Sequence, residues 1–117
     1  MARPQLYFNR NCSTARKARD LLAAAGVEVE VVEYLKAPPD RATLRALVGA
    51  VDAPPAELVR KDKRFKELGL VADDYRSAGA VVDLLVEHPE LLQRPILVVG
   101  ERGVIGRPPE RVLELVS

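Results

Sequence analysis

Apolar positions in the first 34 residues follow a strand pattern, then a helix pattern, then a strand pattern again. Residues 5–8 alternate polar with apolar or aromatic side chains and end at a polar turn, which predicts a short strand. From Ser13 to Ala25 the apolar side chains recur at helical spacing, and Gly26 stands where a left-handed helix end favours glycine. Residues 27–34 alternate Val with Glu, which predicts a half-buried strand. A right-handed crossover makes the two strands parallel neighbours.

The middle of the chain has a helical pattern that prolines interrupt. Pro39 ends the extended segment, and Asp40 is placed to cap the helix that follows. Pro89 ends the last helix of this region. The helices expected here cover residues 41–48, 56–59 and 77–88. We therefore expect a helical insert over about residues 39–90 that contains no strand.

The last part of the chain returns to strand patterns. The apolar run 95–100 is typical of a buried strand, residues 101–103 form a hairpin turn, and 104–106 return as a second strand before a helix over 110–116. This order predicts an α/β fold of the thioredoxin-like plan. It consists of a four-stranded mixed sheet with flanking helices and an inserted helical module, in a single domain over residues 1–117.

Composition narrows the classes of partner. The chain has 117 residues, 48% of them apolar and 30% charged, with a net charge of +1. This balance provides no long-range attraction to nucleic acid or anionic membranes, so we expect neither as a partner and interpret the basic run 61–66 as a solvated helical face. Nothing in the sequence requires more than a monomer.

Cellular location is inferred from the N-terminus, the apolar runs and the cysteine content. Residues 1–4 lead directly into the first strand without a signal-peptide pattern. The longest uncharged apolar run is about six residues, against the ~20 needed to cross a bilayer. The single cysteine fits a reducing compartment. We expect a cytoplasmic protein.

Cys12 is the residue with the clearest chemical potential. It follows a strand and precedes a helix, where unpaired backbone N–H groups and the helix dipole favour a thiolate. Arg10 and Arg16 are close in sequence and are expected to act in the same direction. Ser13 and Thr14 add hydroxyl donors beside the sulfur. The alternative is a buried structural cysteine, which this strand–turn–helix context disfavours.

Five segments, in order along the chain, match a set of known motifs. Residues 9–16 are similar to N-x-x-C-x-T-x-R and residues 34–39 to Y-L-x-x-P-P. Residues 58–61 are similar to L-[LV]-R-[KT] and residues 88–96 to H-P-x-L-x-x-R-P-[IL], and residues 106–110 to a closing G/C-R-P-x-E. With these motifs the chain resembles the glutaredoxin-linked arsenate reductases, the ArsC family in the ArsC/Spx-like branch of the thioredoxin superfamily.

The resemblance implies a specific chemistry. In that family a cysteine thiolate, which corresponds to Cys12, attacks the arsenic of arsenate and forms a covalent adduct. Three family arginines hold the oxyanion and correspond to Arg60, Arg94 and Arg107. Guanidinium groups stay charged, donate in pairs and offset the repulsion between thiolate and anion. Pro95 is expected to be cis and to lie against the sulfur.

The same resemblance implies the reductants. Glutathione serves as co-substrate, glutaredoxin resolves the mixed disulfide, and arsenite leaves. One cysteine agrees with thiols supplied from outside the chain. One Cys and one His cannot assemble a metal site, so we expect no metal and no bound organic cofactor.

Two departures from the motifs bear on the cysteine. Phe8 occupies a position that is often histidine in the family, and Arg10 occupies one that is usually small or proline. Arg10 is therefore expected to compensate electrostatically.

Two alternative functions remain open. One is a regulator similar to the Spx proteins that bind RNA polymerase. Such regulators usually carry a Cys-x-x-Cys switch, whereas here Ala15 follows Cys12 by three positions. The other is a family thiol oxidoreductase of unknown substrate.

Overall fold

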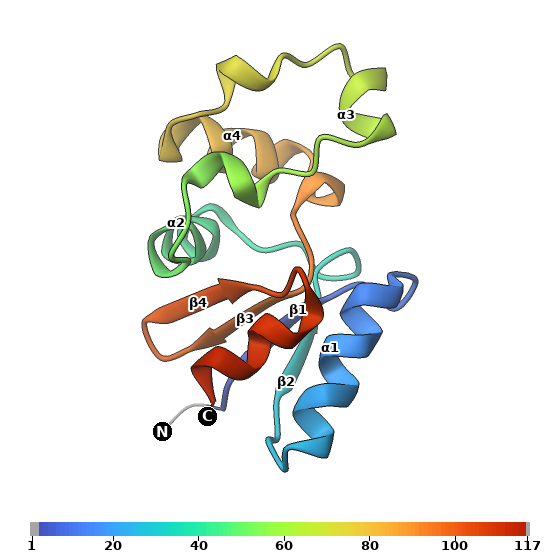
Figure 1. Cartoon of the computed structure of the whole chain (residues 1–117). Helices are drawn as coiled ribbons and strands as arrows, with labels where there is room; N and C mark the ends of the chain where they lie inside the picture. The colour runs from blue at the N-terminus through green and yellow to red at the C-terminus, as the bar shows by residue number, and fades with distance from the viewer. Residues whose placement is uncertain (1–2, 117) are drawn as a thin grey trace.

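The computed structural model describes residues 3–116, so residues 1, 2 and 117 of the predicted domain lie outside the described residues, as does the start of the segment assessed for a signal peptide. Four short strands form one mixed sheet in the order β2-β1-β3-β4 (Figure 1). The strands are β1 (Gln5–Phe8), β2 (Glu30–Glu33), β3 (Ile96–Val99) and β4 (Arg102–Ile105). β1 and β2 are parallel, and the other two pairings are antiparallel. The predicted four-stranded mixed sheet is confirmed.

Helices and 3₁₀ turns occupy much of the rest of the described chain. They are α1 (Ser13–Ala24), α2 (Arg41–Ala50), η1 (Pro55–Leu58), α3 (Lys63–Glu67), η2 (Ala72–Asp74), α4 (Ala78–Glu87), η3 (Pro89–Leu91) and η4 (Pro109–Leu115). As predicted, the Asp40 carboxylate caps α2 by accepting from the Thr43 N–H at 2.8 Å. Gly26 ends α1 with φ +77°. Among residues 3–116, no helix combines the length and the apolar character needed to cross a membrane.

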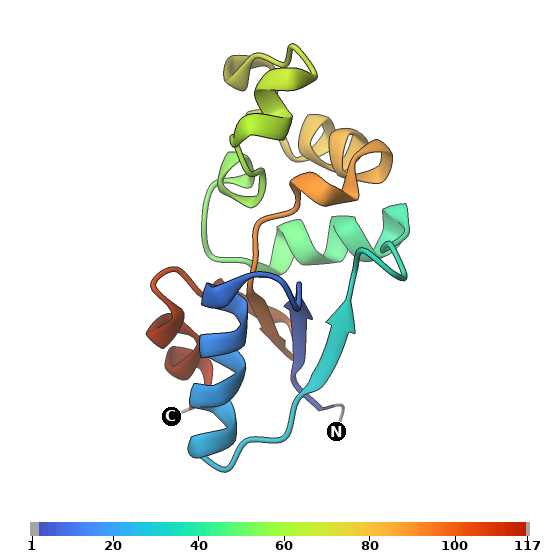
Figure 2. The ribbon, with the colours of Figure 1, turned by 90° about the vertical axis from the view of Figure 1, so that its right-hand side faces the viewer.

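Alternation along the strands sends side chains to two different layers. Leu6 and Phe8 are buried together with α1 and η4, which lie side by side on one face of the sheet (Figure 2). Tyr7 and Ile96 are buried on the opposite face, where α2 and the other helices of the insert pack. The period of two in the sequence thus assigns each strand residue to its layer.

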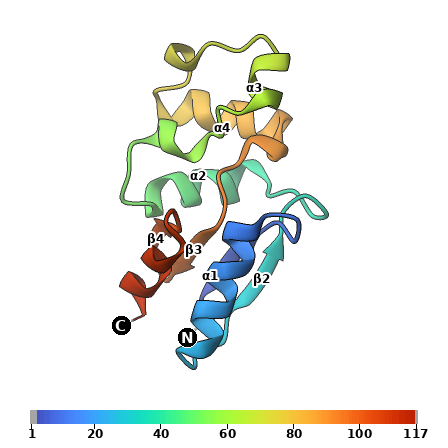
Figure 3. The same cartoon turned by 45° about the vertical axis from the view of Figure 1, so that its right-hand side comes forward.

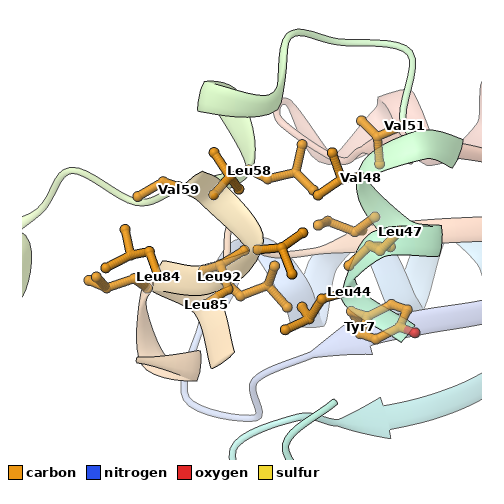
Figure 4. Packing of buried hydrophobic residues seen from close by; sticks show 14 of the residues in the cluster. Tyr7, Leu44, Leu47, Val48, Val51, Leu58, Val59, Leu84, Leu85 and Leu92 are labelled. Atoms are coloured by element: carbon orange, nitrogen blue, oxygen red, sulfur yellow. The ribbon is translucent and has the colours of Figure 1, made fainter. Parts of the chain in front are cut away.

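A single apolar cluster continues from the sheet into the insert. Leu44 and Leu47 of α2 lie between Tyr7 of the sheet and the side chains of Leu58 and Leu85 (Figure 4). The insert is therefore anchored to the sheet by shared burial of apolar surface.

Several predicted elements differ from the structure in bounds or type. The helix predicted over 56–59 is a 3₁₀ helix, η1 (Pro55–Leu58). The strand predicted over 27–34 pairs only over Glu30–Glu33, because its partner β1 offers four residues. Arg102 and Gly103 belong to β4 instead of the hairpin turn, because Gly100 adopts φ +61° and makes the reversal with Glu101. The strand ends at Ile105, so Gly106 lies outside it. The final segment is a 3₁₀ helix, η4, in place of an α-helix.

Candidate active site

Cys12 lies at the junction between the sheet and the helical insert. The chain leaves β1 through a tight turn in which the Asn9 carbonyl accepts from the Cys12 N–H at 3.0 Å and the Asn9 side chain accepts from the Asn11 N–H at 2.9 Å. Cys12 has extended backbone angles and is the N-cap residue of α1. Figure 3 shows that α1 begins next to the segment that descends from the insert into β3. The sulfur is half-buried at this helix start.

Several groups compete to set the acidity of the thiol. Burial of the Cys12 sulfur opposes ionisation, whereas the Ala15 backbone amide and the guanidinium groups of Arg94 and Arg107 favour the thiolate. The favourable groups prevail, so the pKa of Cys12 lies below its ordinary value. The sequence prediction of an activated thiol agrees with this balance, although two of the groups responsible are far from Cys12 in the sequence.

Arg107 and Arg94 approach the sulfur together. Arg107 Nη2 lies 3.8 Å from Cys12 Sγ, and Arg107 Nε donates to the Arg94 carbonyl at 2.9 Å. The Arg94 side chain interacts with the sulfur as well, while its Nε is buried and has no hydrogen-bond partner among residues 3–116. Both arginines precede cis prolines: Pro95, as predicted, and Pro108.

Gly106 permits the close packing behind these arginines. Its N–H donates to the Pro95 carbonyl at 2.8 Å. A Cβ at this position would lie 2.8 Å from both Pro95 Cγ and Val112 Cγ1, closer than real Cβ atoms approach. Only glycine lets the end of β4 lie against Pro95, and this contact holds Arg107 at the site.

Arg60 reaches the same region from the insert. Its backbone N–H donates to the Leu91 carbonyl at 2.7 Å, which joins the insert to the segment that carries Arg94. Its Nε lies 3.2 Å from Asp62 Oδ2, and Asp62 also caps α3. The guanidinium acts electrostatically on Tyr34, and the described contacts do not bring it to the sulfur itself.

Tyr34 is a site residue that the sequence analysis did not single out. It follows β2 directly, is fully buried, and has Arg94, Arg60 and Cys12 as its charged or ionisable neighbours. Burial raises its pKa despite the two arginines. The signal was available in the strand pattern, because parallel neighbouring strands bring the residues that follow them to one edge of the sheet.

The supporting residues predicted from proximity in sequence have other partners. Arg10 donates to both carboxylate oxygens of Glu33, at 2.8 and 3.2 Å, and is not among the groups that act on the thiol. Arg16 donates to the Arg10 carbonyl at 2.6 Å and so braces the loop. The described hydrogen bonds include none from the Ser13 or Thr14 hydroxyl to the sulfur. The structure does not bear out electrostatic compensation by Arg10, because Glu33 engages its guanidinium.

Phe8 belongs to the core beneath the loop. Its ring is buried against α1, with the Arg19 guanidinium 5.1 Å from the ring centroid. This position therefore serves packing in this chain.

Comparison with known proteins gives a consistent result. The ArsC family model matches residues 7–115. The chain is 46% identical to the uncharacterized protein YfgD of Escherichia coli strain K12, over 97% of this chain and 96% of YfgD. It is 40% identical to an arsenate reductase of Rhizobium meliloti, over 94% of this chain and 79% of that protein.

A solved structure supports the same assignment. The arsenate reductase from Vibrio cholerae superimposes with a TM-score of 0.85 at 34% identity, covering 95% of each chain. The family model and the solved structure therefore agree on the family and on the fold. This chain belongs to the ArsC family.

Proposed function

We propose that this chain is an arsenate reductase that depends on glutathione and glutaredoxin, with the Cys12 thiolate as its nucleophile. The observation that carries the proposal is the half-buried thiol of lowered pKa beside Arg94 and Arg107. The arsenate reductases among its relatives support the same activity.

Oxyanion binding is the first step. Arg94 and Arg107 lie at the sulfur, and the buried Nε of Arg94 has a proton that no described group accepts. An arsenate oxygen would satisfy that donor. Arg60 adds a third guanidinium from the insert, for which the anion would compete with Asp62. Charge-assisted, paired donors of this kind suit a tetrahedral oxyanion.

Covalent attack is the second step. The thiolate sulfur forms a bond to arsenic, one arsenic–oxygen bond breaks, and the departing oxygen takes up protons and leaves as water. Arsenic remains in the +5 state, bound to Cys12. The arginines offset the repulsion between thiolate and anion during attack.

Reduction follows with thiols from outside the chain. A glutathione thiolate attacks the Cys12 sulfur, and the sulfur–arsenic bond breaks with its electron pair going to arsenic. Arsenic thereby passes from +5 to +3 and leaves as arsenite, while Cys12 and glutathione, which together give up the two electrons, remain joined as a mixed disulfide. A glutaredoxin thiolate then attacks the glutathione sulfur of that disulfide, which regenerates the Cys12 thiolate. Cys12 is the only cysteine in the sequence, so the thiol that resolves the mixed disulfide comes from a partner. Glutathione and glutaredoxin act in the reducing cytoplasm, so the proposal includes a cytoplasmic location. It also takes the chain to act as a monomer, since no step needs a second copy.

The test is an assay coupled to NADPH through glutathione reductase, with arsenate, glutathione and glutaredoxin. Wild type is expected to turn over, and Cys12→Ser to lose all turnover above background. Arg94→Lys and Arg107→Lys are expected to raise the KM for arsenate. Absence of turnover by the wild type, together with glutathionylation of Cys12, would contradict the proposal and favour a thiol oxidoreductase of another substrate.

A further inference from the structure

Tyr34 carries a hydroxyl group that is completely enclosed by protein. Its side chain has 0% exposure, and its hydroxyl donates to the Leu92 carbonyl at 3.4 Å. A phenol has one proton and two lone pairs. With the proton directed at Leu92, the oxygen is left to accept a hydrogen bond, and the Arg94 guanidinium is the neighbouring donor that acts on this hydroxyl.

The topology explains why these groups meet. Phe8 and Glu33 are partners in the parallel β1–β2 pair, so the loop that carries Cys12 and the residue Tyr34 leave the sheet at the same edge. The segment from Leu92 to Arg94 passes over this edge as it enters β3.

We propose that Tyr34 is a positioning residue for Arg94: the enclosed hydroxyl, oriented by the Leu92 carbonyl, holds the guanidinium so that its remaining N–H groups face the Cys12 sulfur and the oxyanion. The kinetic part of this inference rests on the proposed arsenate reductase function, whereas the effect on the sulfur does not.

A neutral partner suits this role. Arg60 is held by the Asp62 carboxylate, which offsets its charge. Arg94 has no carboxylate partner among residues 3–116. A carboxylate would hold Arg94 more strongly but would cancel the positive charge that stabilises a thiolate and binds an anion. A phenol fixes the geometry and leaves that charge available.

The first test compares Tyr34→Phe with Tyr7→Phe. Tyr7 is also buried, but the pKa of its hydroxyl is raised by burial and by Glu30, and no arginine of the site acts on it. We expect Tyr34→Phe to lower the rate of Cys12 alkylation by iodoacetamide at pH 7 about threefold, with the midpoint of the pH profile moved upward. We expect the KM for arsenate to rise about fivefold to tenfold, as for loss of a hydrogen bond to a charged group. Tyr7→Phe should change neither.

A double-mutant cycle separates positioning from general loosening. In an Arg94→Ala background, Tyr34→Phe should have no further effect on alkylation, because the group through which it acts is gone. Equal effects in both backgrounds, or a Tyr34→Phe profile identical to that of Tyr7→Phe, would overturn the proposal.

Two further measurements cover the cases in which the wild type does not reduce arsenate or the Tyr34→Phe variant does not fold. If the wild type does not reduce arsenate, the proposed function fails, and the alkylation cycle alone decides the role of Tyr34. If Tyr34→Phe does not fold, NMR of the wild-type chain replaces it. Nuclear Overhauser contacts between the Tyr34 ring or hydroxyl protons and the Arg94 guanidinium protons support the inference, and their absence overturns it.

Discussion

At the scale of single residues, distance along the chain is a poor guide to which cation lies at the sulfur and stabilises the thiolate. Arg10 is two positions from Cys12, yet its guanidinium pairs with Glu33 at the end of β2. Arg107 is 95 positions away and lies 3.8 Å from the sulfur. A carboxylate within reach engages the nearer cation, whereas Arg107 has the Arg94 carbonyl and the thiol as its described acceptors.

Arg107→Ala tests the contribution of the distant cation. Loss of this guanidinium should raise the pKa of Cys12 and move the midpoint of its alkylation profile to higher pH. Arg102→Ala, on the exposed end of the same strand β4, is the matched control and should leave the profile unchanged. An identical shift in both variants would mean that net charge, and not contact, governs the thiol.

Arg10→Ala tests the opposite expectation for the near cation. Because Glu33 engages Arg10, its removal should change the alkylation rate of Cys12 at pH 7 by less than about twofold, as for an exposed and screened charge. Alkylation kinetics provide the measurement. A fall as large as that of Arg107→Ala would show that Arg10 acts on the sulfur after all.

The lowered pKa of Cys12 also predicts a pH dependence of stability. In the folded chain the thiol ionises at lower pH than in the unfolded chain. Its stabilising contribution is therefore complete above the unfolded pKa and is lost as pH falls through the folded pKa. The stability difference between wild type and Cys12→Ala, measured by urea unfolding, should become more favourable to wild type as pH rises across this window. A difference independent of pH would contradict the assignment.

At the scale of elements, the hairpin β3–β4 brings two distant sequence segments to one helix start. Arg94 enters β3 and Arg107 leaves β4, so the antiparallel pairing places both at the same end of the hairpin. Gly106 then allows the chain to pass within contact of Pro95. The geometry of the site thus depends on a packing contact without chemical function of its own.

Gly106→Ala should disturb both stability and the site. The added methyl group meets Pro95 and Val112, and overpacking of this kind costs about 1–3 kcal/mol. Gly49→Ala is the control, since its Cβ meets nothing within 4 Å and its position inside α2 favours alanine by about 0.5–1 kcal/mol. In thermal unfolding, Gly106→Ala should lower the Tm relative to wild type and Gly49→Ala should raise it.

At the scale of the whole molecule, the insert and the sheet share one buried cluster. Side chains of the insert, such as Leu58 and Leu85, pack in the same cluster as Tyr7 and Ile96 of the sheet. Arg60 comes from the insert and Arg94 from the segment that links it to the sheet. The relative placement of Arg60 and Arg94, which we propose bind the anion, therefore depends on this shared core.

Leu58→Ala should test that dependence. Leu58 is fully buried, and truncation of such a side chain costs about 2–5 kcal/mol. We expect the midpoint of urea unfolding to fall to a lower urea concentration. The amides of β1 and β3 should lose hydrogen-exchange protection together with those of α4. The exposed Leu35→Ala should change little. Protection retained in the strands but lost in α4 would instead indicate that the insert unfolds independently.

The sequence by itself determined the sheet and the place of Cys12 at a helix start, because these depend on local patterns. Periods of two and 3.6, the Asp40 cap and the strand–turn–helix around Cys12 are all encoded within a few residues of each other. The family motifs also associate Cys12 with three distant arginines, Arg60, Arg94 and Arg107.

Only the tertiary structure decided which groups face the sulfur. Arg107 contacts the thiol, Arg10 pairs with Glu33, and Tyr34 is fully buried with Arg94 among its neighbours. These outcomes depend on competition between acceptors and on packing across segments far apart in the chain. Such competition is settled by three-dimensional distance, which patterns along a sequence do not contain.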